Sequence, residues 1–198
     1  MVLLRLGWWI LGWKDEFPYS PNDIVRNPSS LQWRGNQIHE ARKLTSKSAV
    51  IWFPPANHVI KWNVDASVQP IHSRSAIGGV LRDHNGKFIC LFSSPIPFME
   101  INSAEIIAIH RAIKISLTRD MCKGAKIILE SDSANAVRWS NGEEGGPCNL
   151  NFQLNFIRNA KRNGLDISIV HMGRSANFVA DSLAKQGIHR QSDFIAWL

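Results

Sequence analysis

The order of strand-like and helix-like patterns after residue 59 constrains the fold of this chain more than any other feature. Residues 60–67, 76–82 and 87–93 alternate apolar and polar side chains or are short and apolar, which is typical of β-strands. Only short connections separate these segments, and Gly86 supplies the positive φ that the second turn needs. The sequence therefore predicts three consecutive strands that pair as antiparallel hairpins.

Patterns typical of helices then alternate with two further strands. We expect helices at residues 103–118, 133–140, 151–163 and 176–187, and strands at residues 126–130 and 166–171. Ser103 is a suitable N-cap for the first helix, and Gly187 is a suitable end for the last. Strands that are joined through helices pair in parallel. The predicted fold is α/β: a mixed five-stranded sheet, with three antiparallel strands and then two parallel ones, and helices on both faces.

The chain before residue 59 has a different composition. Its first 13 residues are strongly apolar, but they include Arg5 and fall short of the about 20 residues that cross a bilayer. Residues 17–58 contain five prolines, which interrupt strands and helices, and one short helix pattern at residues 37–48. We therefore expect a poorly structured extension or linker at residues 1–58, one domain at residues 59–198, and no membrane span.

Composition narrows the class of protein further. The 198 residues are 44% hydrophobic and 20% charged, which excludes a disordered or fibrous chain. The net charge of +7 allows a polyanionic partner, although no polybasic run occurs. Cys90, Cys122 and Cys148 lie far apart and form no Cys-x-x-Cys pair, which argues against a zinc knuckle or a disulfide framework. Reduced cysteines favour an intracellular protein, in the nucleus or the cytoplasm.

Acidic residues fall at the ends of several predicted elements: Asp65 on the first strand, Glu105 in the first turn of the first helix, Asp132 after the fourth strand, and Asp181 in the last helix. Such positions can converge on one edge of a sheet, where carboxylates repel one another unless a divalent cation is present. Two ions of Mg²⁺, or of Mn²⁺, would bind both the attacking and the leaving oxygens of a phosphodiester. Singly, each acid has a structural explanation, such as the helix dipole for Glu105. Their joint placement favours a metal site.

Five motifs in order resemble the ribonuclease H family: KWNVDAS at 61–67, IGGVLRDHNG at 77–86, NSAEIIA at 102–108, ESDS at 130–133 and HMGRSANFVADSLA at 171–184. In detail they are similar to the ribonuclease-H-like domains of plant genomes and plant non-LTR retroelements. The match covers about residues 59–190. This resemblance implies the fold predicted above.

The resemblance also implies roles for individual residues. The metal-binding carboxylates would be Asp65, Glu105, Asp132 and Asp181. His171 corresponds to a mobile histidine that assists the proton step or product release.

Further positions follow from the same motifs. Asn102 matches an asparagine that contacts the nucleic acid near the cut, and Ser67 and Ser133 are expected in the substrate-binding set. Arg174 and Asn177 match the family's pattern in the last motif, where we interpret them mainly as scaffold for the loop and the helix start.

The implied activity is metal-dependent endonuclease cleavage of the RNA strand of an RNA–DNA hybrid. One Mg²⁺ would lower the pKa of the attacking water and a second would stabilise the leaving 3′ oxygen, which leaves 5′-phosphate and 3′-hydroxyl ends. The RNA 2′-hydroxyl distinguishes the strand to be cut, and contacts with the backbone dominate binding. We expect a monomer whose partner is nucleic acid.

Two departures from the family pattern keep other functions open. Ala66 replaces a glycine that usually follows the first aspartate, where a positive φ would cost on the order of 1 kcal/mol. The segment between Ser140 and Asp166 carries few basic residues (Arg158, Lys161 and Arg162), so weak affinity for the hybrid is expected. One alternative is a catalytically weak nucleic-acid-binding module derived from a retroelement ribonuclease H domain. Another is a nuclease or integrase of this fold that acts on DNA.

Overall fold

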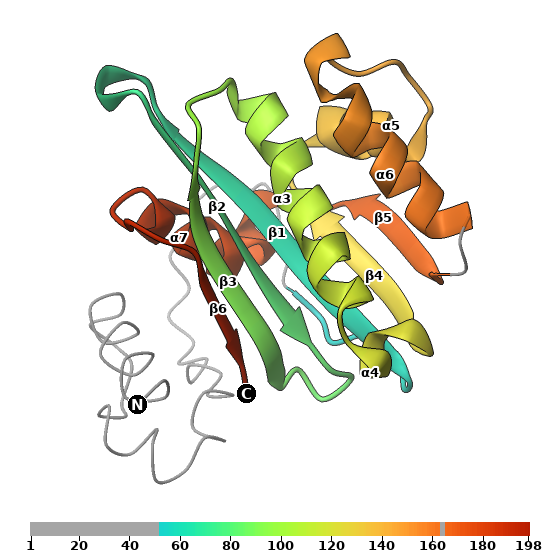
Figure 1. Ribbon diagram of the computed structural model, residues 1–198. Helices are drawn as coiled ribbons and strands as arrows, with labels where there is room; N and C mark the ends of the chain where they lie inside the picture. Colours follow the sequence, from blue (N-terminus) through green and yellow to red (C-terminus); the bar gives the residue numbers. More distant parts are fainter. Residues whose placement is uncertain (1–51, 163–164) are drawn as a thin grey trace, which may run out of the picture. The chain divides into compact units, whose positions relative to one another are not determined.

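The structure, a computed structural model, describes residues 52–162 and 165–198 (Figure 1). In this part of the chain the strands are β1 (Val59–Gln69), β2 (Arg74–Arg82), β3 (Phe88–Ile96), β4 (Lys126–Ser131), β5 (Ile167–His171) and β6 (Phe194–Trp197). The α-helices are α3 (Ile101–Leu117), α4 (Asp120–Lys123), α5 (Ala134–Asn141), α6 (Asn151–Arg162) and α7 (Phe178–Gly187). Short 3₁₀ turns are η2 (Pro70–His72), η3 (Cys148–Leu150) and η4 (Arg174–Ala176).

The strands form one mixed sheet in the order β5-β4-β1-β2-β3-β6. β1 pairs antiparallel with β2, and β2 with β3, whereas β1 with β4 and β4 with β5 pair in parallel. The α/β class and the mixed pairing of the first five strands are confirmed. The expected count of five strands is wrong, because β6 adds a sixth, antiparallel to β3. Four residues are too few to show the alternation that identifies a strand in a sequence.

The start of α3 also differs from expectation. The helix begins at Ile101, with Glu100 at its N-cap and without a side-chain capping bond, so Ser103 is not the cap. Ser103 is buried within the first turn instead. The short helix α4 was not expected either, since four residues give no helical periodicity.

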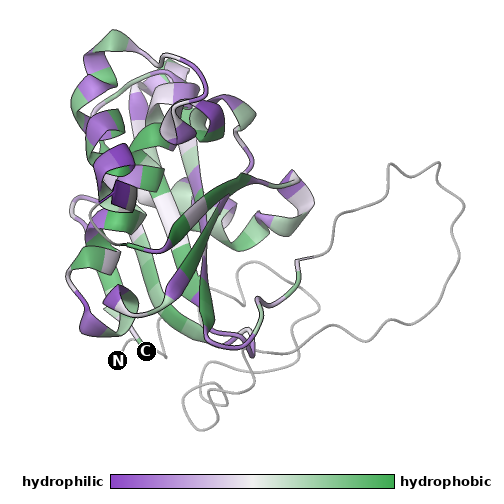
Figure 2. Cartoon of the chain, turned by 90° about the vertical axis from the view of Figure 1, so that its right-hand side faces the viewer, coloured by the Kyte–Doolittle hydropathy of each residue, from purple (hydrophilic) through white to green (hydrophobic). Residues whose placement is uncertain are grey.

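Helices cover both faces of the sheet. In Figure 1, α3, α5 and α6 lie in front of the sheet and α7 lies behind it. Figure 2 shows mainly apolar residues along the central strands and more polar residues on the outward turns of the helices. None of the described helices has the length and apolar character that a membrane span requires.

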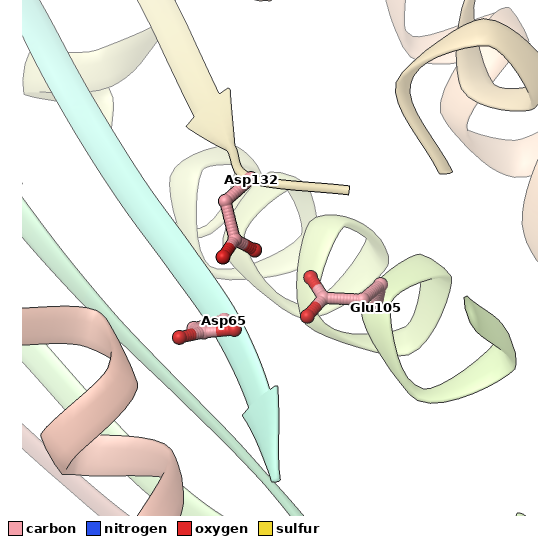
Figure 3. Close-up of side chains that lie close together, drawn as sticks. All are labelled: Asp65, Glu105 and Asp132. Atoms are coloured by element: carbon pink, nitrogen blue, oxygen red, sulfur yellow. The ribbon is translucent and has the colours of Figure 1, made fainter. Parts of the chain in front are cut away.

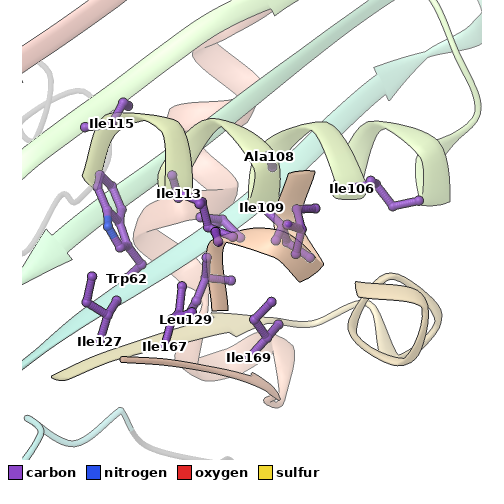
Figure 4. Packing of buried hydrophobic residues seen from close by; sticks show 14 of the residues in the cluster. Trp62, Ile106, Ala108, Ile109, Ile113, Ile115, Ile127, Leu129, Ile167 and Ile169 are labelled. Atoms are coloured by element: carbon purple, nitrogen blue, oxygen red, sulfur yellow. The ribbon is translucent and has the colours of Figure 1, made fainter. Parts of the chain in front are cut away.

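The core lies between α3 and the strands β1 and β4 (Figure 4). Ile109 and Ile113 follow one another at helical spacing on the buried side of α3, and Leu129 faces them from β4. Trp62 is fully buried on β1, and its indole Nε1 donates a hydrogen bond of 2.9 Å to Ser116 Oγ. Burying each such aliphatic side chain contributes roughly 1.5–3 kcal/mol, so this layer fixes α3 on the sheet.

The described chain includes seven residues before β1. Trp52 packs beside the turn between β2 and β3, and the guanidinium carbon of Arg82 lies 4.4 Å from the centre of its ring. Phe53 accepts a hydrogen bond of 3.0 Å from Lys61 Nζ at its carbonyl oxygen. The extension expected at residues 1–58 and the helix pattern at residues 37–48 otherwise lie outside the described residues.

On the other face, α7 comes unusually close to β2 at Gly78. A Cβ atom at Gly78 would lie 2.2 Å from the backbone nitrogen of Ala184 and 2.6 Å from the carbonyl carbon of Leu183. Gly78 is also the cross-strand partner of Asp65. The missing side chain therefore lets α7 pack directly behind the strand that carries Asp65.

We expect Gly78→Ala to destabilise the domain by about 1–3 kcal/mol or more, because two backbone segments must separate to accept the methyl group. Urea unfolding followed by circular dichroism measures the change in the free energy of unfolding. Gly124→Ala is the matched control, since no atom of the described residues lies within 4 Å of a Cβ atom there. Equal stability of the two variants would show that α7 does not depend on this close approach.

Candidate metal centre

Three acidic side chains from three different elements meet at one edge of the sheet (Figure 3). Asp65 lies on β1, Glu105 lies in the second turn of α3, and Asp132 directly follows β4. One carboxylate oxygen from each lies within 4.8 Å of the others. They meet because β1 and β4 run in parallel and end toward the same edge, and α3 starts there.

Backbone and hydroxyl donors hold the two buried carboxylates. The backbone nitrogen of Ala66 donates to Asp65 Oδ1 at 2.8 Å and to Glu105 Oε1 at 3.1 Å. Ser131 Oγ donates to Glu105 Oε2 at 3.2 Å. These bonds fix the orientation of both carboxylates before any ligand binds.

Burial and mutual repulsion make this arrangement unfavourable for charged acids. Burial raises the pKa of Asp65 to about 7, and the nearby charges of Asp132 and Asp181 act in the same direction. Burial also raises the pKa of Glu105 well above its usual range, and the charge of Asp65 adds to that effect. At neutral pH the group therefore favours either a bound proton or a bound cation.

The donor set fits a divalent metal ion. It offers carboxylate oxygens only, which hard cations such as Mg²⁺ and Mn²⁺ prefer. It also comes from two strands and a helix that are packed into the core, so its geometry is preorganised. A cation at this point would replace the protons that the raised pKa values otherwise require.

Asp181, the fourth expected ligand, stands somewhat apart from this group. It lines the same pocket as Asp65, Glu105 and Asp132, which has a volume of about 610 Å³. Its Oδ2 atom accepts a bond of 2.7 Å from Lys185 Nζ, one turn further along α7. The structure thus brings three of the four expected ligands together and places the fourth in the wall of the same pocket.

The expected substrate residues lie around this pocket. Ser67 lines it directly. Ser133 Oγ donates to Asn102 Oδ1 at 3.4 Å and also accepts a bond from Ala136 N, which caps α5. His171 ends β5 with an exposed side chain, and its Nε2 atom lies 3.2 Å from the carbonyl oxygen of Asp132. Their contacts with a substrate stay predictions.

Ala66 causes no backbone strain. It lies within β1, paired with Ile77, and among residues 52–162 and 165–198 the non-glycine residues with positive φ are His58 and Ser73. The strain that a positive φ would bring is therefore absent at Ala66. Its backbone amide donates hydrogen bonds to Asp65 and Glu105, as the amide of a glycine at this position would.

The sequence did not reveal the cations of the site. Arg174, which we interpreted as scaffold, has a side chain that is 91% exposed, and its Nε atom donates to Asp132 Oδ2 at 3.1 Å. The two residues are 42 positions apart in the sequence, so no local sequence pattern predicts their contact. Lys185 stands four residues after Asp181, a helical spacing that could have predicted the pair. The scaffold role of Asn177 is confirmed, because its Nδ2 atom donates to the carbonyl of Val64 at 2.8 Å.

The raised pKa of Asp65 predicts a pH-dependent stability of the metal-free protein. The folded state binds a proton more tightly than the unfolded state, whose Asp has its usual pKa of 3.8. The resulting stabilisation is complete below about pH 4 and is lost as the pH rises through about 7.

In the presence of a chelator, we expect Asp65→Asn to be more stable than the parental protein at pH 8, by on the order of 1–3 kcal/mol. The difference between the two should be smaller at pH 5. Urea titrations at pH 5, 7 and 8 measure it, and a pH-independent difference would contradict the raised pKa.

The chain is similar to known proteins in both sequence and fold. Residues 63–187, more than half of the chain, match the reverse transcriptase-like family. No curated protein matches the sequence closely enough to count as a relative.

Solved structures of ribonucleases H share the fold. A ribonuclease H1 isolated from compost by a metagenomic approach is 23% identical, with a TM-score of 0.61 over 67% of this chain and 96% of its own. The same enzyme in complex with an RNA/DNA hybrid gives a TM-score of 0.59 at 23% identity, over 66% and 96% of the two chains. The N-terminal RNase H domain of a Mycobacterium tuberculosis protein gives 0.58 at 16% identity, over 66% and 94%.

These matches confirm the resemblance that the motifs predicted, while an origin in a plant or a retroelement stays a prediction. The family match spans the segment that carries Asp65, Glu105, Asp132 and Asp181. Given this match and the shared fold, the chain belongs to the reverse transcriptase-like family, and its domain has the fold of ribonucleases H.

Proposed function

We propose that this protein is a metal-dependent endonuclease that hydrolyses the RNA strand of RNA–DNA hybrids. The observation that carries the proposal is the group of Asp65, Glu105 and Asp132, whose oxygens lie within 4.8 Å in the wall of a pocket. A ribonuclease H1 of the same fold has been solved with an RNA/DNA hybrid bound. Family and fold thus support an RNA–DNA hybrid as the substrate class, and the acidic group supports metal-dependent hydrolysis.

The acids would hold the metal. Asp65, Glu105 and Asp132 would be its ligands, and Asp181, which lines the same pocket, would complete a second position. Two Mg²⁺ ions, when bound, supply Lewis acidity that activates water and offsets charge on the leaving oxygen. The Ala66 amide keeps the first two carboxylates aimed at this position.

Other side chains would act on the nucleic acid itself. The exposed guanidinium of Arg174 lies at the pocket beside Asp132, where it can donate to a phosphate oxygen of the strand being cut. His171, exposed at the end of β5, would deliver a proton to the 3′ oxygen as the P–O3′ bond breaks. Ser67, Asn102 and Ser133 would contact the sugar–phosphate backbone and the 2′-hydroxyl.

One observation favours the alternative of a catalytically weak nucleic-acid-binding module. Two of the cations near α5 and α6 are used within the chain: Arg138 pairs with Glu144 at 2.9 Å. Arg158 Nη2 donates to the carbonyl of Trp139 at 2.6 Å. These two side chains offer a substrate little free positive charge, so its affinity for the domain should be low and sensitive to salt.

Cleavage of a labelled RNA–DNA hybrid in Mg²⁺ tests the proposed activity. We expect the parental protein to cut the RNA strand and Asp132→Asn to lose activity by about a hundredfold or more, because a metal ligand is removed. Asp166→Asn is the matched control, since the same change is made at an exposed residue outside the pocket. Chelation of the metal should abolish the activity of the parental protein.

The same assay separates the alternatives. If the protein binds the hybrid in a salt-sensitive way but does not cut it under any of these conditions, the binding module replaces the nuclease. If it cuts all-DNA duplexes in preference to hybrids, the RNA–DNA specificity is wrong. Equal loss of activity in Asp132→Asn and Asp166→Asn would remove the proposed role of the acidic group.

A further inference from the structure

A buried polar network lies beside the acidic group, on β4, β1 and β2. We name it the Glu130 network; its members are Lys61, Asn63, Arg82 and Glu130, each exposed by 8% or less. Lys61, Asn63 and Glu130 belong to the sequence motifs around Asp65 and Asp132, and Arg82 belongs to the motif at 77–86, but the proposed reaction gives them no role. Their position raises the question of what four polar side chains do inside the domain.

Hydrogen bonds link the members across three strands. Glu130 accepts at Oε1 from Lys61 Nζ at 2.8 Å and at Oε2 from Asn63 Nδ2 at 2.8 Å. Asn63 Oδ1 in turn accepts from Arg82 Nη1 at 2.8 Å. The guanidinium of Arg82 also lies over the ring of Phe88, 4.9 Å from its centre. The network thus fixes side chains of β4, β1 and β2 to one another.

The network stands where the pairing of β1 with β4 stops. Asn63 and Glu130 are the last register partners of that ladder. Asp65 and Asp132 follow each of them by two residues, with no ladder bond between them. The distance between the two carboxylates therefore depends on the course of β1 and β4 beyond this last pair. The bond between Asn63 and Glu130 holds the pair together.

The network also reaches the loop that follows β5. Asn63 Nδ2 lies 3.3 Å from the sulfur of Met172, and the backbone nitrogen of Met172 donates to the carbonyl of Ser131 at 2.9 Å. Met172 directly follows His171. One asparagine therefore contacts β4, β2 and the segment beside the exposed histidine.

Stability alone is a weak reason for such a network. Buried ion pairs are often no more stable than apolar side chains of similar volume, since both charges must leave water. Burial lowers the pKa of Arg82 to about 10, which still leaves the guanidinium charged at neutral pH. The network therefore keeps charges inside the domain at a cost in desolvation free energy. A role in the geometry of the neighbouring carboxylates can explain why these charges are there.

We propose that the Glu130 network consists of positioning residues for the carboxylate group, which set the distance between Asp65 and Asp132 that a divalent ion requires. The inference rests on the proposed metal site. It acts through the last pair of the β1–β4 ladder, without any contact between the network and the ion. Residues that orient metal ligands typically contribute 10–100-fold to metal affinity, so an effect of about tenfold is expected.

The variant Lys61→Met/Glu130→Leu tests the proposal. It removes one positive and one negative charge, so the net charge beside the acids is unchanged and only the geometry is altered. We expect it to fold with a lower thermal midpoint, because Arg82 loses a buried counter-charge, and its affinity for Mn²⁺ to fall about tenfold or more. Electron paramagnetic resonance of free Mn²⁺, without nucleic acid, measures the affinity.

A second variant and a control keep the result interpretable. Asn63→Leu also leaves the charge unchanged, and it should weaken Mn²⁺ binding even if the double variant does not fold. Ser116→Ala removes a buried hydrogen bond from Trp62, on the face covered by α3. Its thermal midpoint should fall while its affinity for Mn²⁺ stays parental.

Two results would overturn the inference while leaving the metal site intact: parental Mn²⁺ affinity in the folded network variants, or an equal loss of affinity in Ser116→Ala. If the parental protein itself binds no Mn²⁺, the proposed metal site fails and the inference fails with it. A loss of affinity confined to the network variants supports the positioning role.

Discussion

The parallel pairing of β1 with β4 is the constraint on which the candidate site depends. It directs Asp65 and Asp132 to the same edge, and α3 adds Glu105 because its first turns begin there. Every other contribution acts on this arrangement: the Ala66 amide orients two of the acids, and the apolar layer around Trp62 holds α3 in place. A change that shifted this one ladder would separate all three acids.

Local patterns predicted much of this structure from the sequence. Alternation identified the central strands, and the motif positions identified Asp65, Glu105 and Asp132, which the fold brings together. The missing parts depend on long-range contacts. β6 exists because it pairs with β3, and Trp197 of this strand stacks with Arg119, 78 residues earlier in the chain. The contact of Arg174 with Asp132 likewise has no counterpart in local sequence spacing.

Individual ion pairs, and not the net positive charge of the chain, determine the charge near the pocket. The net charge of +7 is spread along the chain, yet the two less buried acids of the pocket each pair with a cation. Arg174 forms an ion pair with Asp132, and Lys185 forms one with Asp181. Within residues 52–162 and 165–198, Asp65 and Glu105 have no such cationic partner, and their pKa values are raised. In the free protein, side-chain cations thus pair with the two less buried acids, and the raised pKa values of the two buried acids favour a bound proton.

The contact between the ring of Trp52 and the guanidinium of Arg82 affects how long a fragment must be to form the complete domain. The strand pattern begins near residue 59, but the indole that covers Arg82 comes from seven residues before β1. A fragment cut at the start of the strand pattern would open the end of the Glu130 network to water. Solvent would then compete for the hydrogen bonds of Arg82 and Lys61. The smallest fragment that keeps the native interior is therefore longer than the repeating pattern of the sequence indicates.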